Sequence, residues 1–242
     1  MSRGSTLGYV HSIQTLGTLD GPGVRFVLFL QGCHLRCGCC HNPDTWERSG
    51  GTPYTPNEIL EKVENYRSYF GEKGGITVSG GEPLLQAEFV TELFTLCKER
   101  GINTCLDTSG SIPVSEVTTL LSVTDRVLLD VKYASDEEYK SYVGCPIALP
   151  LAFLAHLNKK RIPVTLRTVL IPSKNDDART ARFLRSLRET YASIDTVELL
   201  PFRKICSTKY ESLGIPFRFM DLDEASIDDV QAMYARIEMV EE

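Results

Sequence analysis

Residues 24–40 read VRFVLFLQGCHLRCGCC, a short apolar run followed at once by four cysteines. Apart from Arg25, the run Val24–Leu30 is apolar on both of its faces, as a parallel strand buried on both sides is. The cysteines that follow it are Cys33, Cys37, Cys39 and Cys40. In a parallel α/β fold, ligands bind where strands end and loops begin, so this loop is predicted to form a functional site.

The rest of the chain alternates similar short runs with amphipathic helical stretches. Five further strands are predicted at Ile76–Ser79, Asn103–Asp107, Val127–Val131, Val164–Val169 and Thr196–Leu200, and the region before Val24 adds a candidate at Gly8–Ile13. Helices are predicted after a capping box at Thr55–Glu58 and over Gln86–Arg100, Ala178–Tyr191 and Ser226–Met239. Six strand–helix units imply a parallel sheet, and eight would close a barrel. The pattern therefore predicts an α/β fold, a partial and open (β/α)6 barrel, in one domain over residues 1–242.

Composition and charge exclude several classes of protein. The net charge of −6 argues against a nucleic-acid surface, which is normally basic. No apolar run is long enough to span a bilayer, and Met1–Gly8 lacks the pattern of a signal peptide, so we expect a cytoplasmic protein. Disulfides are not expected in such a chain. The four scattered cysteines are predicted to be small buried apolar residues: Cys97, Cys105, Cys145 and Cys206.

The spacing Cys-x3-Cys-x2-Cys of Cys33, Cys37 and Cys40 suits a [4Fe–4S] cluster. An electron-transfer cluster generally takes four cysteines, whereas three leave one iron open to a substrate. Zinc is the alternative, with His34 or His41 as a fourth ligand. Structural zinc usually takes two ligand pairs separated by a longer insert, and no second pair follows here. The spacing favours iron–sulfur and leaves zinc open.

The cysteine spacing after a first strand resembles the signature of the radical S-adenosylmethionine superfamily. Neighbouring segments resemble its glycyl-radical-enzyme activating family, nearly along the whole chain and in the same order. These segments are Gly17–Phe26, Gln31–Cys33, Cys40–Trp46, Ser79–Pro83, Cys105–Gly110, Leu129–Lys132 and Glu198–Pro201.

The resemblance implies that S-adenosylmethionine binds the open iron and that one electron splits it into methionine and a 5′-deoxyadenosyl radical. By the same resemblance, the cofactor amino group meets the turn Gly80, Gly81 and Glu82, and the candidates for other cofactor contacts are Cys39, His41, Asp130, Lys132, Arg167 and Arg203. A monovalent cation (Na⁺ or K⁺) is implied at Asp107, Thr108, the carbonyl of Leu128, and Asp130; oxygen ligands suit such a hard cation.

Three of these residues keep a second interpretation. Asp130 and Lys132 alternate at a strand end and share one face, so an internal ion pair is the alternative to cofactor binding. Arg167, an interior cation, is predicted to pair with a carboxylate, either of the cofactor or of the protein. Asp20 is a candidate catalytic residue near the protein substrate, and equally a turn-forming residue before glycine.

Two positions depart from the family pattern. Cys39 stands where an aromatic residue that packs near the adenine is usual, which raises the question whether its thiol competes as a ligand. Arg203 follows Phe202 where close relatives carry histidine. Arginine can donate hydrogen bonds to a ribose but cannot act as a titratable base.

No cysteine lies between Cys40 and Gly80, where many activating enzymes carry a cysteine-rich insert. This favours the compact type, an oxidoreductase that takes one hydrogen atom from a glycine of pyruvate formate-lyase. The resemblance further implies flavodoxin or ferredoxin as the electron donor, and we expect a monomer. The alternatives are an activase of another glycyl radical enzyme, a radical enzyme with another substrate, and a non-catalytic zinc or thiol-redox protein.

Overall fold

The computed structural model describes residues 6–239 of the chain. Residues 1–5, part of the stretch in which no signal peptide is predicted, lie outside the described residues. The chain divides into two compact units, which are described one at a time. The first comprises Met1–His34 and Thr45–Leu128, and the second comprises Leu35–Asp44 and Leu129–Glu242. The interpretation of the whole chain as one domain stays a prediction.

The first unit contains five strands in the order β3-β1-β2-β4-β5. Their bounds are β1 (Gly8–Gly17), β2 (Arg25–Leu30), β3 (Thr52–Tyr54), β4 (Gly75–Gly80) and β5 (Asn103–Thr108). β2, β4 and β5 run parallel, whereas β1 runs antiparallel to β2 and to β3. The predicted strand at the N-terminus is confirmed and is longer than expected. The sequence does not predict β3, an edge strand of three residues with Pro53 at its centre.

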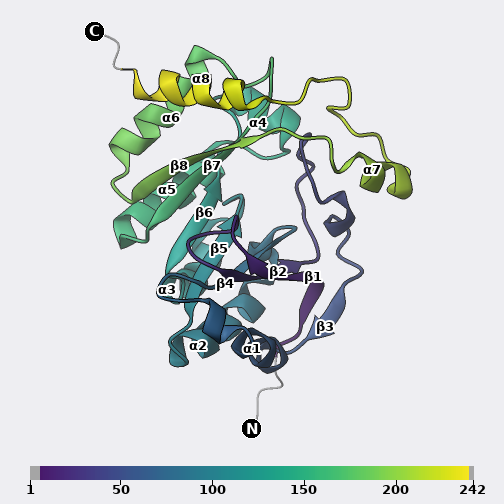
Figure 1. Ribbon diagram of the computed structural model, residues 1–242, viewed down its shortest axis with the longest axis vertical. Helices are drawn as coiled ribbons and strands as arrows, with labels where there is room; N and C mark the ends of the chain where they lie inside the picture. Colours follow the sequence, from purple (N-terminus) through teal and green to yellow (C-terminus); the bar gives the residue numbers. More distant parts are fainter. Residues whose placement is uncertain (1–5, 240–242) are drawn as a thin grey trace. The chain divides into compact units, whose positions relative to one another are not determined.

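The helices of the first unit are α1 (Pro56–Glu64), α2 (Ala87–Glu99) and α3 (Thr118–Ser122), with short 3-10 turns η2 (Arg67–Tyr69), η3 (Pro83–Gln86) and η4 (Val114–Glu116). α1 and α2 pack against each other (Figure 1). The predicted capping box is confirmed, because the Thr55 hydroxyl accepts from the Glu58 backbone N–H and the Glu58 carboxylate accepts from the Thr55 backbone N–H at 2.7 Å. A further 3-10 turn, η1 (Pro43–Thr45), lies where the chain passes from one unit to the other.

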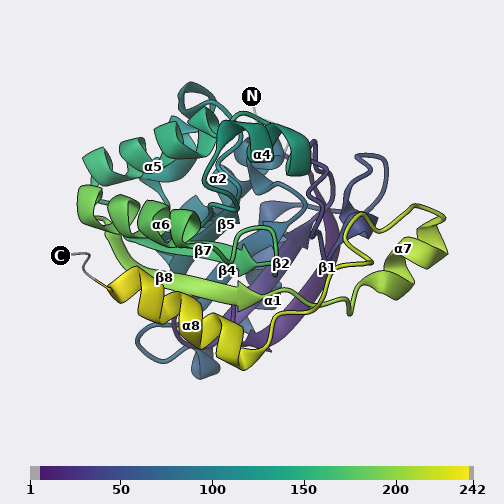
Figure 2. The ribbon, with the colours of Figure 1, turned by 90° about the horizontal axis from the view of Figure 1, so that it is seen from above.

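The second unit contains the end of β6 (Arg126–Asp130) with β7 (Val164–Leu170) and β8 (Ile194–Pro201), of which β7 and β8 pair in parallel. Its helices are α4 (Asp136–Tyr142), α5 (Ala148–Lys160), α6 (Ala178–Thr190), α7 (Ser207–Leu213) and α8 (Ile227–Glu238). α6 and α8 pack against each other and against β8 (Figure 2). Both helices begin where predicted, α6 after the N-cap Asp177 and α8 after a capping box formed by Ser226 and Asp229.

The strands and helices of the two units confirm the predicted α/β class, and the strands do not close into a barrel. The six strands predicted for the open barrel occur as β2, β4, β5, β6, β7 and β8. All four scattered cysteines are buried, as predicted: Cys97, Cys105, Cys145 and Cys206. None of the described helices combines the length and apolar character that a membrane-spanning helix needs.

Candidate functional site

The cysteine loop begins at the carboxyl end of β2, in the first unit. There the Gly32 backbone N–H donates to the carbonyl of Thr45 at 2.8 Å, and the Cys33 N–H donates to the carbonyl of Trp46 at 3.1 Å. These bonds tie the start of the loop to the segment that follows it in the chain. Cys33 is half-buried and forms no disulfide among the described residues.

The Gly80-Gly81 turn lies directly beside this segment. The Gly81 N–H donates to the carbonyl of Leu30, and the Glu82 N–H donates to the carbonyl of Gly32, both at 2.9 Å. A Cβ on Gly81 would lie 2.2 Å from the Gly32 carbonyl oxygen, so only glycine permits this approach. Gly81 therefore lies close to the backbone of Gly32. This contact fixes the turn beside Cys33.

Glu82 is a buried carboxylate, 1% exposed, and it anchors the next loop of the first unit. It accepts hydrogen bonds from the Thr108 hydroxyl at 2.5 Å, from the Ser109 backbone N–H at 3.0 Å and from the Ser109 hydroxyl. It also accepts from the Leu84 N–H at 3.2 Å. Both carboxylate oxygens of Glu82 thus accept hydrogen bonds within the protein. These bonds join the end of β4 to the end of β5, and we call them the Glu82 clamp.

A chain of side chains extends from this clamp toward the cysteine loop. The Ser109 and Ser111 hydroxyl oxygens lie 2.7 Å apart, and the Ser111 hydroxyl lies 3.1 Å from His34 Nε2. Sequence reasoning did not predict this chain, because serine and histidine 77 positions apart form no local pattern. The chain links Glu82 to the residue that follows Cys33.

The predicted cation ligands of the first unit have partners there. The Asp107 carboxylate accepts from the Ser79 hydroxyl at 2.7 Å, and the Thr108 hydroxyl, besides donating to Glu82, accepts from the Gly110 N–H at 3.1 Å. Leu128 lies within β6. The monovalent-cation site stays a prediction.

Asp20 lies in the loop that precedes β2, whereas Cys33 follows the end of the same strand. The Asp20 carbonyl accepts from the Thr77 hydroxyl at 2.7 Å, and Thr77 also accepts from the buried Arg25 guanidinium at 3.0 Å. The loop thus has the turn role that sequence reasoning allowed. Its catalytic role toward a substrate stays a prediction.

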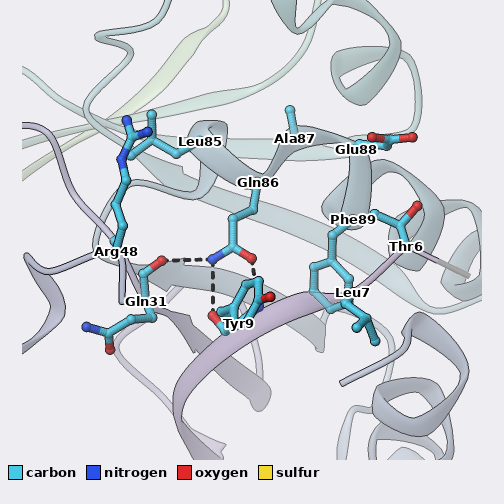
Figure 3. Close-up of a pocket in the computed structure, with 11 residues that line it drawn as sticks. Thr6, Leu7, Tyr9, Gln31, Arg48, Leu85, Gln86, Ala87, Glu88 and Phe89 are labelled. Atoms are coloured by element: carbon cyan, nitrogen blue, oxygen red, sulfur yellow. Dashed lines mark hydrogen bonds between the residues drawn. The ribbon is translucent and has the colours of Figure 1, made fainter. Parts of the chain in front are cut away.

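A cavity of 370 Å³ opens beside Gly32 in the first unit (Figure 3). The Gln86 amide crosses its floor: Oε1 accepts from the Tyr9 N–H at 2.8 Å, and Nε2 donates to the carbonyls of Tyr9 and Gln31 (Figure 3). Arg48 extends along one wall (Figure 3). Because the amide satisfies three backbone groups, its role is to fasten β1 to the end of β2.

The second unit holds the other three cysteines, on a loop whose backbone is fixed at several points. The Arg36 N–H donates to the carbonyl of Val143 at 3.0 Å, and the Gly38 N–H donates to the carbonyl of Tyr142 at 2.8 Å. The Tyr210 hydroxyl donates to the carbonyl of Cys40 at 3.0 Å. Main-chain hydrogen bonds and the Tyr210 hydroxyl therefore hold the loop, and none of these bonds involves a cysteine thiol.

The three cysteines of this loop differ in burial. Cys37 and Cys40 are half-buried, whereas Cys39 is 5% exposed. Burial raises the pKa of the Cys39 thiol to about 11, so it stays protonated at neutral pH. A buried neutral thiol suits a bystander better than a competing ligand.

Asp130 and Lys132 form the internal ion pair that was the alternative interpretation, with Oδ2 and Nζ 2.5 Å apart. Burial disfavours the charged ammonium, but the Asp130 carboxylate and the Cys37 thiol outweigh it, so the pKa of Lys132 is raised well above its usual value. Lys132 is thus a buried permanent cation near Cys37. Its contact with a cofactor stays a prediction.

Arg167 pairs with a carboxylate of the protein, because its Nε lies 2.9 Å from Glu198 Oε2 on the neighbouring strand β8. A contact between Arg167 and the cofactor stays a prediction. The pair joins β7 to β8 inside the second unit.

His41 and Arg203 lie side by side. His41 Nε2 lies 3.0 Å from the Arg203 carbonyl, which can only accept, so Nε2 carries the proton. Burial lowers the pKa of His41, which favours the neutral ring. The Arg203 guanidinium donates to the carbonyl of Ala225 at 2.6 Å. The two residues therefore fasten the segment after Cys40, and a contact with a ribose stays a prediction.

Within the described residues, no group of three or more histidine, cysteine, aspartate or glutamate side chains is arranged to hold a metal ion. The donor set nevertheless has the right chemistry for iron–sulfur. Cys33, Cys37 and Cys40 are half-buried cysteines on an anchored loop, and a permanent cation, Lys132, lies near Cys37. Thiolates are the ligands that iron–sulfur clusters take.

Comparison with known proteins points the same way. The family model described as the Radical SAM superfamily matches residues 27–184. The pyruvate formate-lyase 1-activating enzyme of Escherichia coli (strain K12) is 40% identical to this chain over 219 residues, which cover 88% of each protein. The pyruvate formate-lyase-activating enzyme of Listeria monocytogenes serovar 1/2a is 38% identical over 238 residues, which cover 96% of each.

Solved structures show the same fold at lower identity. The crystal structure of Streptococcus suis SuiB bound to S-adenosylmethionine superposes with a TM-score of 0.66 at 11% identity. The match covers 85% of this chain and 44% of that one. At such identity the likeness concerns the fold alone.

Proposed function

Because the chain belongs to the radical SAM superfamily and, within it, to the pyruvate formate-lyase-activating enzymes, we propose that it activates a pyruvate formate-lyase by creating a radical on one of its glycines. The family implies a [4Fe–4S] cluster and S-adenosylmethionine as cofactors. When bound, this pair supplies the one-electron cleavage of S-adenosylmethionine and hence the radical that takes the glycine hydrogen.

One observation supports the ligand assignment above the others. Of the four clustered cysteines, Cys33, Cys37 and Cys40 are half-buried, whereas Cys39 is buried. The three accessible thiols are those with the Cys-x3-Cys-x2-Cys spacing. We assign them as the cluster ligands and Cys39 as a bystander.

The other residues of the proposed site bind and orient the cofactor. Backbone groups of the turn at Gly81 lie beside Cys33, and the hydrogen bonds of the Glu82 clamp hold this turn in place. Lys132, fixed by Asp130, keeps a positive charge near Cys37. A fixed cation stabilises negative charge on thiolates and on a carboxylate of the cofactor. The proposed roles are thus positioning and charge compensation.

The proposal extends to partners. The protein substrate is pyruvate formate-lyase, the electron donor is flavodoxin or ferredoxin, and the enzyme acts as a cytoplasmic monomer. A small redox protein suits a cluster whose potential must lie toward the negative end of the roughly −700 to +450 mV range of such centres.

Anaerobic reconstitution with iron and sulfide tests the proposal. We expect a brown protein that, once reduced, forms 5′-deoxyadenosine from S-adenosylmethionine. With a pyruvate formate-lyase we expect the EPR doublet of a glycyl radical as well. The matched control is a formate-lyase whose acceptor glycine is replaced by alanine, which must give no doublet.

Two results would contradict the proposal in different ways. Deoxyadenosine without a glycyl doublet for any formate-lyase would keep the radical chemistry and refute the substrate. A colourless protein that takes up one zinc and never cleaves S-adenosylmethionine would refute the cluster itself.

A further inference from the structure

The hydroxyl of Tyr133, a residue that no part of the proposed mechanism uses, is a buried donor without a partner. Tyr133 follows Lys132 directly, and 1% of its surface is exposed. Its oxygen is shielded from solvent and forms no hydrogen bond with any residue that the structure describes. Unpaired buried donors are rare in native proteins because a group removed from water loses its hydrogen bonds.

The ring of Tyr133 is held firmly in an aromatic cluster of the second unit. Its centroid lies 5.3 Å from the ring of Tyr142, and it meets the ring of Tyr139 edge-on at 6.3 Å. The hydroxyls of these neighbours both have partners. Tyr139 accepts from the Lys132 N–H at 3.0 Å, and Tyr142 accepts from Lys174 Nζ at 3.3 Å. Of these three tyrosines, Tyr133 alone has an unpaired hydroxyl among the described residues.

The same aromatic cluster supports the cysteine loop. The Tyr142 carbonyl accepts from the Gly38 N–H at 2.8 Å, and a Cβ on Gly38 would lie 2.5 Å from the ring of Phe219. The Phe219 ring in turn meets Tyr142 at 5.5 Å. The loop between Cys37 and Cys40 is thus seated on the cluster that contains Tyr133.

The phenol of Tyr133 therefore lies in the electrostatic neighbourhood of the cysteines. Burial raises the pKa of the Tyr133 hydroxyl far above its usual value and outweighs the opposite effect of Lys132, so the hydroxyl keeps its proton; negative charge on Cys39 or Cys37 acts in the same direction as burial. A neutral thiol is a weak acceptor, whereas a thiolate accepts strongly. Of the two cysteines, Cys37 is the one assigned as a cluster ligand and hence as a thiolate.

We propose that Tyr133 is a positioning residue whose hydroxyl, unpaired in this structure, donates a hydrogen bond to the Cys37 thiolate sulfur when the cluster is bound. The inference rests on the proposed ligand assignment. A hydrogen bond to a ligand sulfur stabilises the reduced cluster, which carries one more negative charge, and so raises the reduction potential. Tyr133 thereby sets how strongly reducing the donor protein must be.

The midpoint potential of the cluster tests the proposal, because it is measured without turnover. Wild type, Tyr133→Phe and Tyr142→Phe are reconstituted anaerobically and titrated by EPR. Tyr142→Phe is the matched control, since it removes a hydroxyl from the same aromatic cluster whose partner is Lys174. We expect Tyr133→Phe to shift to a more negative potential and Tyr142→Phe to match the wild type. Equal potentials in all three loaded proteins would overturn the proposal.

Two further measurements identify the group to which the Tyr133 hydroxyl donates. Unfolding of the cluster-free proteins should show Tyr133→Phe no less stable than wild type and Tyr139→Phe less stable. Equal destabilisation of the two would mean that the Tyr133 hydroxyl already has a partner within the protein, which overturns the proposal. Weaker binding of S-adenosylmethionine by Tyr133→Phe with an unchanged potential would assign the donor to that cofactor instead, and also overturns it. A wild type that loads no cluster would instead refute the proposed function itself.

Discussion

Glu82→Gln is expected to destabilise the cluster-free protein by about 2–5 kcal/mol. The carboxylate accepts two hydrogen bonds at each oxygen, from Thr108 and the Leu84 N–H at Oε1 and from the backbone N–H and hydroxyl of Ser109 at Oε2. Glutamine keeps one of the two oxygens. In place of the other oxygen it has an amide group, which is a donor and faces two groups that are also donors. A hydroxyl can rotate to accept from that amide, whereas a backbone N–H cannot.

The magnitude follows from the two bonds affected. The hydroxyl bond changes from one to a charged group, about 1.5–3 kcal/mol, to one between neutral groups, about 0.5–1.5 kcal/mol, and the backbone N–H left unpaired costs about 1–3 kcal/mol. For a chain of this size, 1 kcal/mol corresponds to roughly 2–4 °C in melting temperature. The expected fall in melting temperature is therefore between about 4 and 20 °C.

Thermal and urea unfolding of the cluster-free protein measure this effect. Glu88→Gln serves as the matched control, because Glu88 lies six residues further along the chain, is exposed and has no hydrogen bond among the described residues. Its free energy of unfolding should stay within about 0.5 kcal/mol of wild type, as for most surface substitutions. If Glu82→Gln changed stability as little as Glu88→Gln, the buried clamp between β4 and β5 would be refuted.

Three other predictions have definite expected results. Cys39→Ser should keep the cluster absorbance and most activity, while Cys37→Ser should lose both; equal losses would show that the wrong triplet is assigned. Gly81→Ala should prevent cluster loading, because its Cβ would meet a backbone carbonyl at 2.2 Å. Gly71→Ala meets nothing within 4 Å, so it should still load the cluster, with a small loss of stability because Gly71 has a positive φ of 55°. Hydrogen bonds from the Thr55 backbone N–H and, to a smaller extent, from the Thr55 hydroxyl lower the pKa of Glu58 from its usual 4.5. The stability that the Glu58 carboxylate adds is therefore present above about pH 4.5 and is lost as the pH falls below that value. Glu58→Gln should therefore flatten the fall in melting temperature between about pH 5 and pH 3, and an unchanged acid limb would contradict this.

Local signals in the sequence predicted most of the elements correctly. The capping box at Thr55 and the N-cap at Ser226 act over three residues, so they can be read directly from the chain. The antiparallel pairing of β1 and the edge strand β3 could not be predicted in this way. β3 has three residues and pairs with β1 more than 40 positions earlier in the chain, so no local pattern specifies it.

The sequence by itself determined the cysteine spacing, its position after β2 and the resemblance that led to the family. Tertiary structure decided how those residues are used. In the folded protein Arg167 pairs with Glu198, and Asp130 pairs with Lys132. Hydrogen-bond donors from the end of β5 surround Glu82. Tertiary structure also separated the one buried thiol, Cys39, from the three accessible ones. Burial and long-range hydrogen bonds depend on which strands become neighbours, and only the folded sheet brings their ends together.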